Sequence, residues 1–463
     1  MILDWRTWVK LGLYSVLIDG ALRKWFMPSM ANALYFMKDF IFIVAYIMFL
    51  LQNGRRSIMP AELRFLRPIF TLTALIIFVQ GLNPRLGSLA AGILGIRHYL
   101  IYVPLLALVP RMFETKEELQ DFLWKYALTV IPVGLLGWLQ FSSPASARIN
   151  TYVGDVDAMN ITSFGSGKVR ITGPFSYISG YVTYLTVIFG FLMTLITKIG
   201  GSKIQKLLMM GALVLCVTNM MMTGSRMPVF SAALIATFYI GTQAVYSQRQ
   251  FRKMLPAIVI VGIISIVGFV RSPAYKAFME RMNKLDTTSD SRISPTKQFE
   301  NFFDIFRYEG RVGGQGAGAY HPATWGLRRA LNLPQGDSIL ELEDEPDRVL
   351  AELGAVGFVL WYGTRFGFLL LLWIVFLQMR DPALRSIALM ALALHLVMLP
   401  GQLVFQHTAG VYYWFLAGFG ALLPRLQRRE ELRAQEQALL EAEELEQESL
   451  DDDEYAEPSP VRG

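Results

Sequence analysis

Apolar runs long enough to cross or nearly cross a lipid bilayer recur along this chain from its first residues to about position 423. A membrane-spanning helix needs about 20 apolar residues. Inside lipid a helix satisfies all of its own backbone hydrogen bonds. Of the 463 residues, 53% are hydrophobic and 17% are charged, whereas roughly 25% of a soluble domain is charged. The pattern therefore predicts an all-α polytopic membrane protein.

We expect about twelve membrane helices, several of them shorter than a full span. They are predicted at Trp8–Ile18, Tyr35–Leu51, Ile69–Gly81, Leu89–Val109, Phe122–Phe141, Phe175–Ile196, Leu207–Thr223, Val229–Tyr246, Leu255–Val270, Val349–Leu377, Ile387–Leu399 and Val411–Leu423.

Basic residues fall at every second connection between these segments. The basic connections are NGRRS…ELRFLR, PRMFETK, KIGGSKIQK, SQRQFRK and QMRDPALR, and LPRLQRR follows the last segment. Basic loops face the cytoplasm. Twelve helices with both termini in the cytoplasm place all of these connections on the same side, and we adopt that topology as the prediction.

The topology divides the chain into four parts. An N-terminal bundle of about nine helices covers residues 1–270, a large periplasmic loop covers 271–348, and about three helices cover 349–424. An acidic, partly disordered cytoplasmic tail covers 425–463, and it is predicted to begin as a charged helix and to end in the disordered sequence DDDEYAEPSPVRG. The tail carries 5 basic and 13 acidic residues, or −8, which leaves 38 basic and 24 acidic residues, or +14, for the rest of the +6 chain. The positive excess is what orients a membrane protein, and it does not imply nucleic acid.

The single cysteine, Cys216, lies inside an apolar run. One thiol forms neither an intrachain disulfide nor a metal site. No small-residue cleavage site follows the first apolar stretch, so we interpret that stretch as a membrane helix and not as a signal peptide.

Two arginines lie within apolar segments, where an ionised side chain is costly and needs a reason. Arg97, beside His98, is predicted either to contact an anionic or polar substrate or to pair with a carboxylate such as Asp19 or Asp39. Arg365 raises the same question, and there a structural ion pair is the favoured interpretation.

Two further arginines lie at the expected outer ends of helices, Arg170 in VRITGPF and Arg226 in GSRMPVF. Pro174 and Pro228 follow them where the next helix should begin, since proline suits the first helical turn, and Ser225 is placed to cap. An arginine beside a helix N-terminus makes an anion site suited to phosphate. The pair predicts a diphosphate site; the alternative is anchoring at lipid headgroups.

Carboxylates crowd the outer start of the tenth expected helix. They are Glu341, Glu343, Asp344, Glu345 and Asp347. Acids at a helix start favour its dipole, which accounts for most of them. One can instead be a general base whose pKa is raised by its like-charged neighbours. No histidine or cysteine stands at zinc-ligand spacing, whereas a divalent cation bridging carboxylates and phosphates stays open.

The sequence GRVGGQGAGAYH in the large loop lacks the residues of a nucleotide-binding loop. Its glycines are predicted to form a tight turn that packs the loop over the membrane domain. His321 follows this turn, either as a surface residue or as a site residue, and His407 is a further outward polar group without an assigned role.

Taken in order, RITGPF, TGSRMP, GQGAGAY and ELGAVG resemble motifs of the O-antigen ligase and polymerase superfamily, membrane glycosyltransferases that handle polyprenyl-diphosphate-linked glycans. The resemblance extends from about Gly20 to Tyr412. It implies a C-class glycosyltransferase architecture that needs no metal or other cofactor. It also implies a diphosphate bound by Arg170 and Arg226. We add Arg97 to this predicted diphosphate site because it is a charge inside an apolar segment.

Many members of this superfamily have a His-Asn pair shortly before ELGAVG, whereas this chain is acidic there. The resemblance therefore implies that a carboxylate, Glu343, Glu345 or Asp347, replaces the histidine as base, or that His321 supplies the base from the loop.

The implied function is a polymerase that joins undecaprenyl-diphosphate-linked repeat units of O-antigen, exopolysaccharide or capsule at the periplasmic face of the bacterial inner membrane. Flippase and chain-length regulator proteins are the implied partners. A ligase that transfers a finished glycan to lipid A-core or protein has the same motifs. A secondary transporter is the alternative from another class, although no internal repeat is found.

Overall fold

The computed structural model describes residues 4–53, 60–154, 162–163, 168–196, 203–246, 313–333, 342 and 344–454, together with isolated positions between 248 and 275. The predicted segment Leu255–Val270, most of the loop from 271 to 312, the carboxylates Glu341 and Glu343, and the end of the tail from residue 455 lie outside this set or largely so.

Apart from one short β ribbon, the elements in the described residues are helices, as the apolar pattern predicts. The N-terminal half contains α1 (Trp5–Ala21), η1 (Leu22–Phe26), η2 (Pro28–Met30), α2 (Ala31–Leu34), α3 (Met37–Asn53), η3 (Ala61–Leu66), α4 (Arg67–Gly81), η4 (Pro84–Leu86), α5 (Leu89–Leu100), α6 (Leu105–Leu108), η5 (Val109–Arg111), α7 (Lys116–Leu128), α8 (Val130–Ser142) and η6 (Arg148–Asn150). The second half contains α10 (Ile178–Ile196), α11 (Lys203–Met222), α12 (Met227–Tyr246), α16 (Pro322–Ala330), α17 (Glu345–Gln378), α18 (Pro382–Met398), α19 (His407–Ala417) and α20 (Phe419–Glu454). A short antiparallel ribbon pairs β1 (Thr162–Ser163) with β2 (Lys168–Val169).

Seven helical segments in the described part of the chain are long and apolar enough to cross a membrane. They are Pro28–Asn53, Leu89–Arg111, Lys116–Ser142, Ile178–Leu195, Lys203–Met222, Met227–Tyr246 and Glu345–Gln378. The other predicted segments within this part also overlap helices, but α1, α4, α18 and α19 are shorter than a full span. The structure therefore establishes a helical membrane protein with seven candidate spans.

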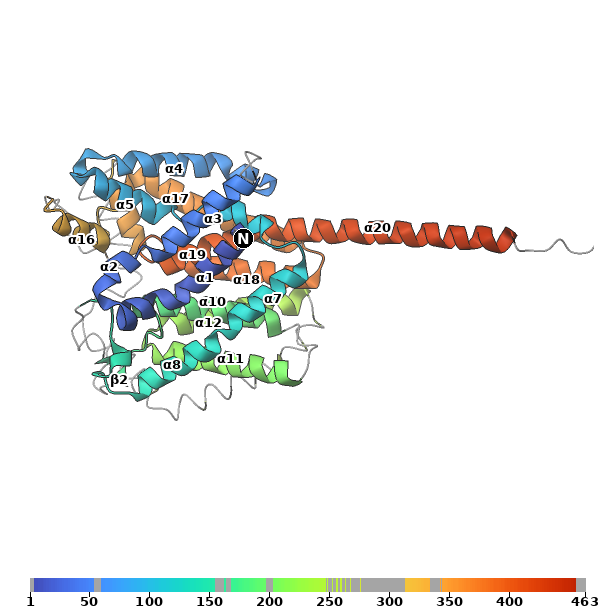
Figure 1. The fold of residues 1–463 in the computed structure, drawn as a ribbon, viewed down its shortest axis with the longest axis horizontal. Coiled ribbons are helices and arrows are strands. Elements are labelled where there is room, and N and C mark those ends of the chain that lie inside the picture. The colour runs from blue at the N-terminus through green and yellow to red at the C-terminus, as the bar shows by residue number, and fades with distance from the viewer. Residues whose placement is uncertain are drawn as a thin grey trace, which may run out of the picture.

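The helices α18 and α19 are mostly buried and lie at the centre of the bundle (Figure 1). The outer helices instead expose large apolar side chains, among them Leu51 on α3, Leu75 on α4 and Val359 on α17. Exposed apolar faces of this kind are stable against lipid tails and costly against water. The pattern agrees with a bundle immersed in a bilayer.

Ion pairs gather several basic connections at one end of the bundle. Arg6 at the start of α1 pairs with Glu114 at 2.9 Å, and Lys116 pairs with both Asp381 and Glu430 at 2.9 Å. The helix α20 leaves the bundle from this end as a long projection, and α16 and β2 lie at the opposite end (Figure 1). The PRMFETK and QMRDPALR connections and the start of the tail thus lie on one side, as basic-residue counting predicts.

The tail is helical over its first part, as predicted, and differs from its prediction only at the end of that helix. No break separates the last membrane segment from the charged helix, because α20 continues from Phe419 to Glu454. It includes residues 451–454, which the sequence assigns to a disordered end.

Candidate functional site

A cavity of about 1090 Å³ lies among α1, α3, α5, α10, α16 and α19. Its polar lining includes Asp19, Arg23, Lys38, Arg97, His321 and His407, and we call it the cationic cavity. These residues come from segments that are far apart in sequence. They meet because α1 ends, and α3, α10, α16 and α19 begin, at the same end of the bundle (Figure 1).

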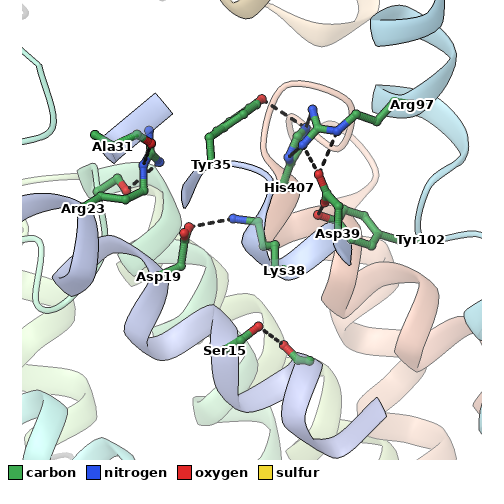
Figure 2. A network of polar contacts seen from close by, with 12 residues as sticks. Ser15, Asp19, Arg23, Ala31, Tyr35, Lys38, Asp39, Arg97, Tyr102 and His407 are labelled. Carbon is green, nitrogen blue, oxygen red and sulfur yellow. Dashed lines mark hydrogen bonds and ion pairs between the residues drawn. The ribbon is translucent and has the colours of Figure 1, made fainter. Parts of the chain in front are cut away.

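Two ion pairs, drawn in Figure 2, supply three residues of the cavity lining, which are Asp19, Lys38 and Arg97. The Nζ of Lys38 lies 2.9 Å from Oδ2 of Asp19, and the Arg97 guanidinium donates to Oδ2 of Asp39. Tyr102 donates its hydroxyl to the other oxygen of Asp39 at 2.5 Å. The pairing offsets most of the cost of placing these charges in a poorly hydrated interior.

Arg97 pairs with Asp39, as one of the two sequence interpretations predicts, and it also lines the cavity, where contact with a substrate stays a prediction. Besides pairing with Asp39, its guanidinium lines the cavity between the rings of Tyr35 and Phe36, 4.7 and 4.6 Å from their centroids. An amino group of the same guanidinium lies 3.2 Å from Nδ1 of His407. The side chain is therefore held rigidly while it faces the cavity.

A glycine turn brings His321 to the cavity. Gly316 and Gly318 adopt φ angles of 109° and 79°, which favour glycine. A Cβ on Gly318 would lie 2.6 Å from the Cα of Gly95 on α5, so the turn sits directly against that helix. Glu352 holds the turn by accepting from the backbone N–H groups of Gly318 and Tyr320 at 2.9 and 3.1 Å. The predicted packing of the glycine loop on the membrane domain is confirmed.

His321 is a neutral hydrogen-bond donor in this position. Its Nδ1 accepts the N–H of Ala323 at 3.0 Å and so caps α16. Burial, together with the nearby Arg348 and Arg97, lowers the pKa of His321 to about 3. A neutral ring that accepts at Nδ1 carries its proton on Nε2. That Nε2 is buried and makes no hydrogen bond of good geometry, although the nearby backbone of Phe405 acts to raise the pKa of the ring. The geometry thus favours donation to a ligand over proton abstraction.

Three helix N-termini reach the cavity. Its lining includes Ser179 and Gly180 of α10, Pro322 and Ala323 of α16, and Thr408 of α19. Helix N-termini present unpaired N–H groups and partial positive charge. Combined with the arginine and lysine side chains and the Nε2–H of His321, they form surroundings that attract an anion such as a phosphate.

Three buried histidines, His98, His321 and His407, place ring nitrogens within 4.8 Å of one another. The rings of His98 and His321 are stacked, with centroids 3.6 Å apart and an interplanar angle of 22°. Nitrogen lone pairs lie in the ring plane, so two nearly parallel rings direct them side by side and not toward one metal ion. His407 also contacts the Arg97 cation. The cluster does not fit a metal ion, and we assign none.

The acidic residues in the first turn of α17, Glu345 and Asp347, do not line the cationic cavity. Glu345 is fully buried, pairs with Arg365 at 2.8 Å and accepts the backbone N–H of Val404 at 2.8 Å. Arg365 is therefore structural, as the sequence favours. Both carboxylate oxygens of Glu345 are engaged, so Glu345 is not available as a general base. Asp347 is half-buried and does not line the cationic cavity, and Glu343 lies outside the described residues.

Arg170 lies near the start of α12. Its Nε donates to the carbonyl of Thr223 at 3.3 Å, three residues before Arg226. Pro228 is the second residue of α12, as predicted. Neither arginine lines the cationic cavity, so the structure does not place them with Arg97 in one site.

The prediction for Pro174 is wrong, because α10 begins four residues later, at Ile178. Lys24 donates to Thr172 Oγ1 and to the carbonyl of Gly173. Arg23 donates to Ser176 Oγ at 3.1 Å. These contacts hold the segment before α10 as a turn, which links the Arg170 region to the cavity.

Sequence reasoning did not assign Arg23 and Lys38 to a site, and it considered Asp19 only as a partner for Arg97. Charged residues at the ends of apolar segments were the signal that could have found them. The fold and the cavity define a helical membrane protein with an internal site suited to an anionic ligand. No protein-family model matches the chain, and no curated protein matches it significantly.

Proposed function

We propose that this protein is a membrane glycosyltransferase that joins glycan units carried on undecaprenyl diphosphate, and that the diphosphate binds in the cationic cavity. The observation that carries the proposal is the convergence of Arg23, Arg97, the His321 donor and three helix N-termini on one cavity, beside the Lys38–Asp19 ion pair. A diphosphate offers the acceptor oxygens that such a set of donors satisfies.

The rim of the cavity suits a substrate with a lipid tail. Phe36, Ile93 and Tyr177 line the cavity and are also 45%, 59% and 46% exposed. Apolar side chains that face both the cavity and the outside would contact the polyprenyl chain in the bilayer while the headgroup lies inside. A volume of about 1090 Å³ leaves room for sugar rings beside the phosphates.

In the proposed reaction, a hydroxyl of an acceptor sugar attacks the anomeric carbon of the donor, and the bond to the diphosphate oxygen breaks. Negative charge then grows on the departing diphosphate. Fixed cations and N–H donors stabilise that charge without rearrangement, which lowers the barrier.

The proposal includes the twelve-span topology with both termini in the cytoplasm of a bacterium. Under that topology the end of the bundle that holds the cavity faces the periplasm. The resemblance of the four motifs to the O-antigen ligase and polymerase superfamily supports this choice of substrate. Arg170 and Arg226 do not line this cavity, so their predicted contact with the diphosphate stays a prediction outside this binding mode.

The test uses purified protein in lipid nanodiscs with lipid-linked repeat units as the only substrate. Elongation without another acceptor supports a polymerase. Transfer that requires lipid A-core or a protein acceptor means a ligase. Movement of the lipid-linked units across the membrane without a change in glycan length means a transporter and overturns the proposal.

Arg97→Ala should weaken binding of undecaprenyl diphosphate by about 10- to 150-fold, because a hydrogen bond to a charged group contributes roughly 1.5–3 kcal/mol. Binding is measured by titration of the nanodisc-embedded protein. Arg380→Ala is the control, since that side chain is 84% exposed at the opposite end. Unchanged affinity in the double variant Arg97→Ala/Asp39→Asn, which leaves no unpaired carboxylate, would remove the diphosphate from this cavity.

A further inference from the structure

Asp19 is an acidic residue that lines the cationic cavity. Among the described residues that line the cavity, no other aspartate or glutamate is found. Asp39, the nearest comparison, has both oxygens engaged by Arg97 and Tyr102. Asp19 therefore stands alone as a carboxylate that a ligand in the cavity can reach.

The two oxygens of Asp19 differ in their surroundings. Oδ2 accepts from Nζ of Lys38 at 2.9 Å, whereas Oδ1 has no hydrogen-bond partner. The residue is only 5% exposed. A buried carboxylate oxygen without a partner is costly, so a site that keeps one is expected to bind a donor there.

Lys38 and the local fold hold Asp19 in one orientation. Asp19 lies near the end of α1, one residue before Gly20, where a Cβ would lie 2.3 Å from the backbone nitrogen of Ser176. The close approach fixes the end of α1 against the turn before α10. Figure 2 shows Asp19 and Lys38 facing each other from neighbouring helices.

We propose that Asp19 is the general base of the glycosyl transfer, an inference that rests on the proposed function. The acceptor hydroxyl donates its hydrogen bond to Oδ1. As the hydroxyl oxygen forms its bond to the anomeric carbon, its proton passes to Oδ1. The bond from that carbon to the diphosphate breaks, and its electron pair leaves with the diphosphate oxygen. Lys38 is a positioning residue that aims the carboxylate.

This assignment gives the cavity residues different roles in the reaction. Arg97 and the Nε2–H of His321 serve the leaving diphosphate, because both are donors. Asp19 serves the attacking hydroxyl, because it is an acceptor. The carboxylate base that the sequence placed at the start of α17 is thus supplied from α1.

The experiment compares Asp19→Asn with wild type in nanodiscs, using lipid-linked repeat units for the rate and undecaprenyl diphosphate alone for binding. The rate of transfer should fall by about 10²- to 10⁴-fold, the usual contribution of a general base. The affinity for undecaprenyl diphosphate should change less than about threefold, since the amide does not touch the phosphates in this assignment.

Two further variants separate a catalytic from a structural role. Asp381→Asn is the matched control, because Asp381 also pairs with a lysine, Lys116, at 2.9 Å but lies at the opposite end, and it should keep the wild-type rate. Asp19→Asn/Lys38→Met removes both buried charges, which restores folding if the pair is only structural. The double variant should stay as slow as Asp19→Asn.

Recovery of the rate in the double variant, or a wild-type rate in Asp19→Asn, overturns the assignment of Asp19 and leaves the proposed function intact. Failure of the wild-type protein to transfer glycan to any acceptor overturns the proposed function and this assignment with it.

Discussion

At the scale of single residues, the two intramembrane arginines show why an ion pair alone does not reveal a role. Arg365 pairs with Glu345 and also donates to the carbonyl of Met398, and it is buried within the bundle. Arg97 pairs with Asp39 but faces the cationic cavity. The sequence context of each is an apolar helix, so only the surroundings distinguish a structural arginine from one available to a ligand.

Lys24 is a second unusual cation at this scale. It is 4% exposed, and its ammonium donates to Thr172 Oγ1 and Gly173 O, neither of which is a carboxylate. Burial lowers the pKa of Lys24 from 10.5 to about 7. Its neutral form is therefore favoured in the folded protein relative to the unfolded chain.

The sign of the resulting pH dependence follows from proton binding. Between about pH 7 and pH 10.5 the unfolded chain binds more protons at Lys24 than the folded protein does, so the free energy of unfolding should rise with pH. The slope is at most about 1.4 kcal/mol per pH unit. Thermal unfolding in detergent at a series of pH values measures it. Lys24→Met should lose this rise, and Lys10→Met, in the first half of α1, should keep it.

At the scale of elements, two motifs that are separated in sequence form one unit. The backbone N–H groups of Gln315 and Gly316 donate to the carbonyls of Ala351 and Glu352 at 2.8 and 3.0 Å. α17 is broken at Gly354, whose φ is 75° and ψ is 178°. The GQGAGAY turn thus docks on the first part of α17, and this docking sets the position of His321.

Gly318→Ala should disrupt that docking, because the added methyl would meet the backbone of Gly95 at a positive φ of 79°. We expect glycosyl transfer to fall at least tenfold, which corresponds to about 1.4 kcal/mol at the transition state, while the membrane bundle stays folded. Activity and circular dichroism of the purified variant check both parts. Gly211→Ala is the control, since a methyl there meets open space; equal activity in the two variants would contradict the role of the turn.

At the scale of the whole molecule, the two ends of the bundle have different chemistry. One end holds the ion-paired basic connections and the root of α20, and the other holds the cationic cavity and α16 (Figure 1). The membrane orientation therefore depends only on which of these two ends faces outward, and labelling from one side determines that.

Leu331→Cys and Leu432→Cys test the orientation, because those side chains are 52% and 58% exposed at opposite ends, whereas the native Cys216 is fully buried. A membrane-impermeant maleimide should label position 331 in intact spheroplasts and position 432 only after permeabilisation. Cys216 alone should stay unlabelled in folded protein. The reverse pattern would place the cavity on the cytoplasmic side.

The sequence by itself determined the helical membrane class, because lipid leaves apolar segments few ways to satisfy their backbone. It also indicated that Arg97 is special, since a charge in an apolar helix needs a partner or a ligand. The basic connections predicted the common end that the ion pairs of Lys116 now show.

Tertiary structure alone decided which polar residues share a site. Asp19, Lys38, His321 and His407 are separated by up to hundreds of residues, and they meet only because several helix ends converge. It likewise showed that Glu345 is engaged in an ion pair with Arg365, and that Pro174 lies four residues before the start of α10. Local sequence fixes which segments are helical and apolar, but the partner of a buried charge depends on packing between distant helices, which no local pattern records.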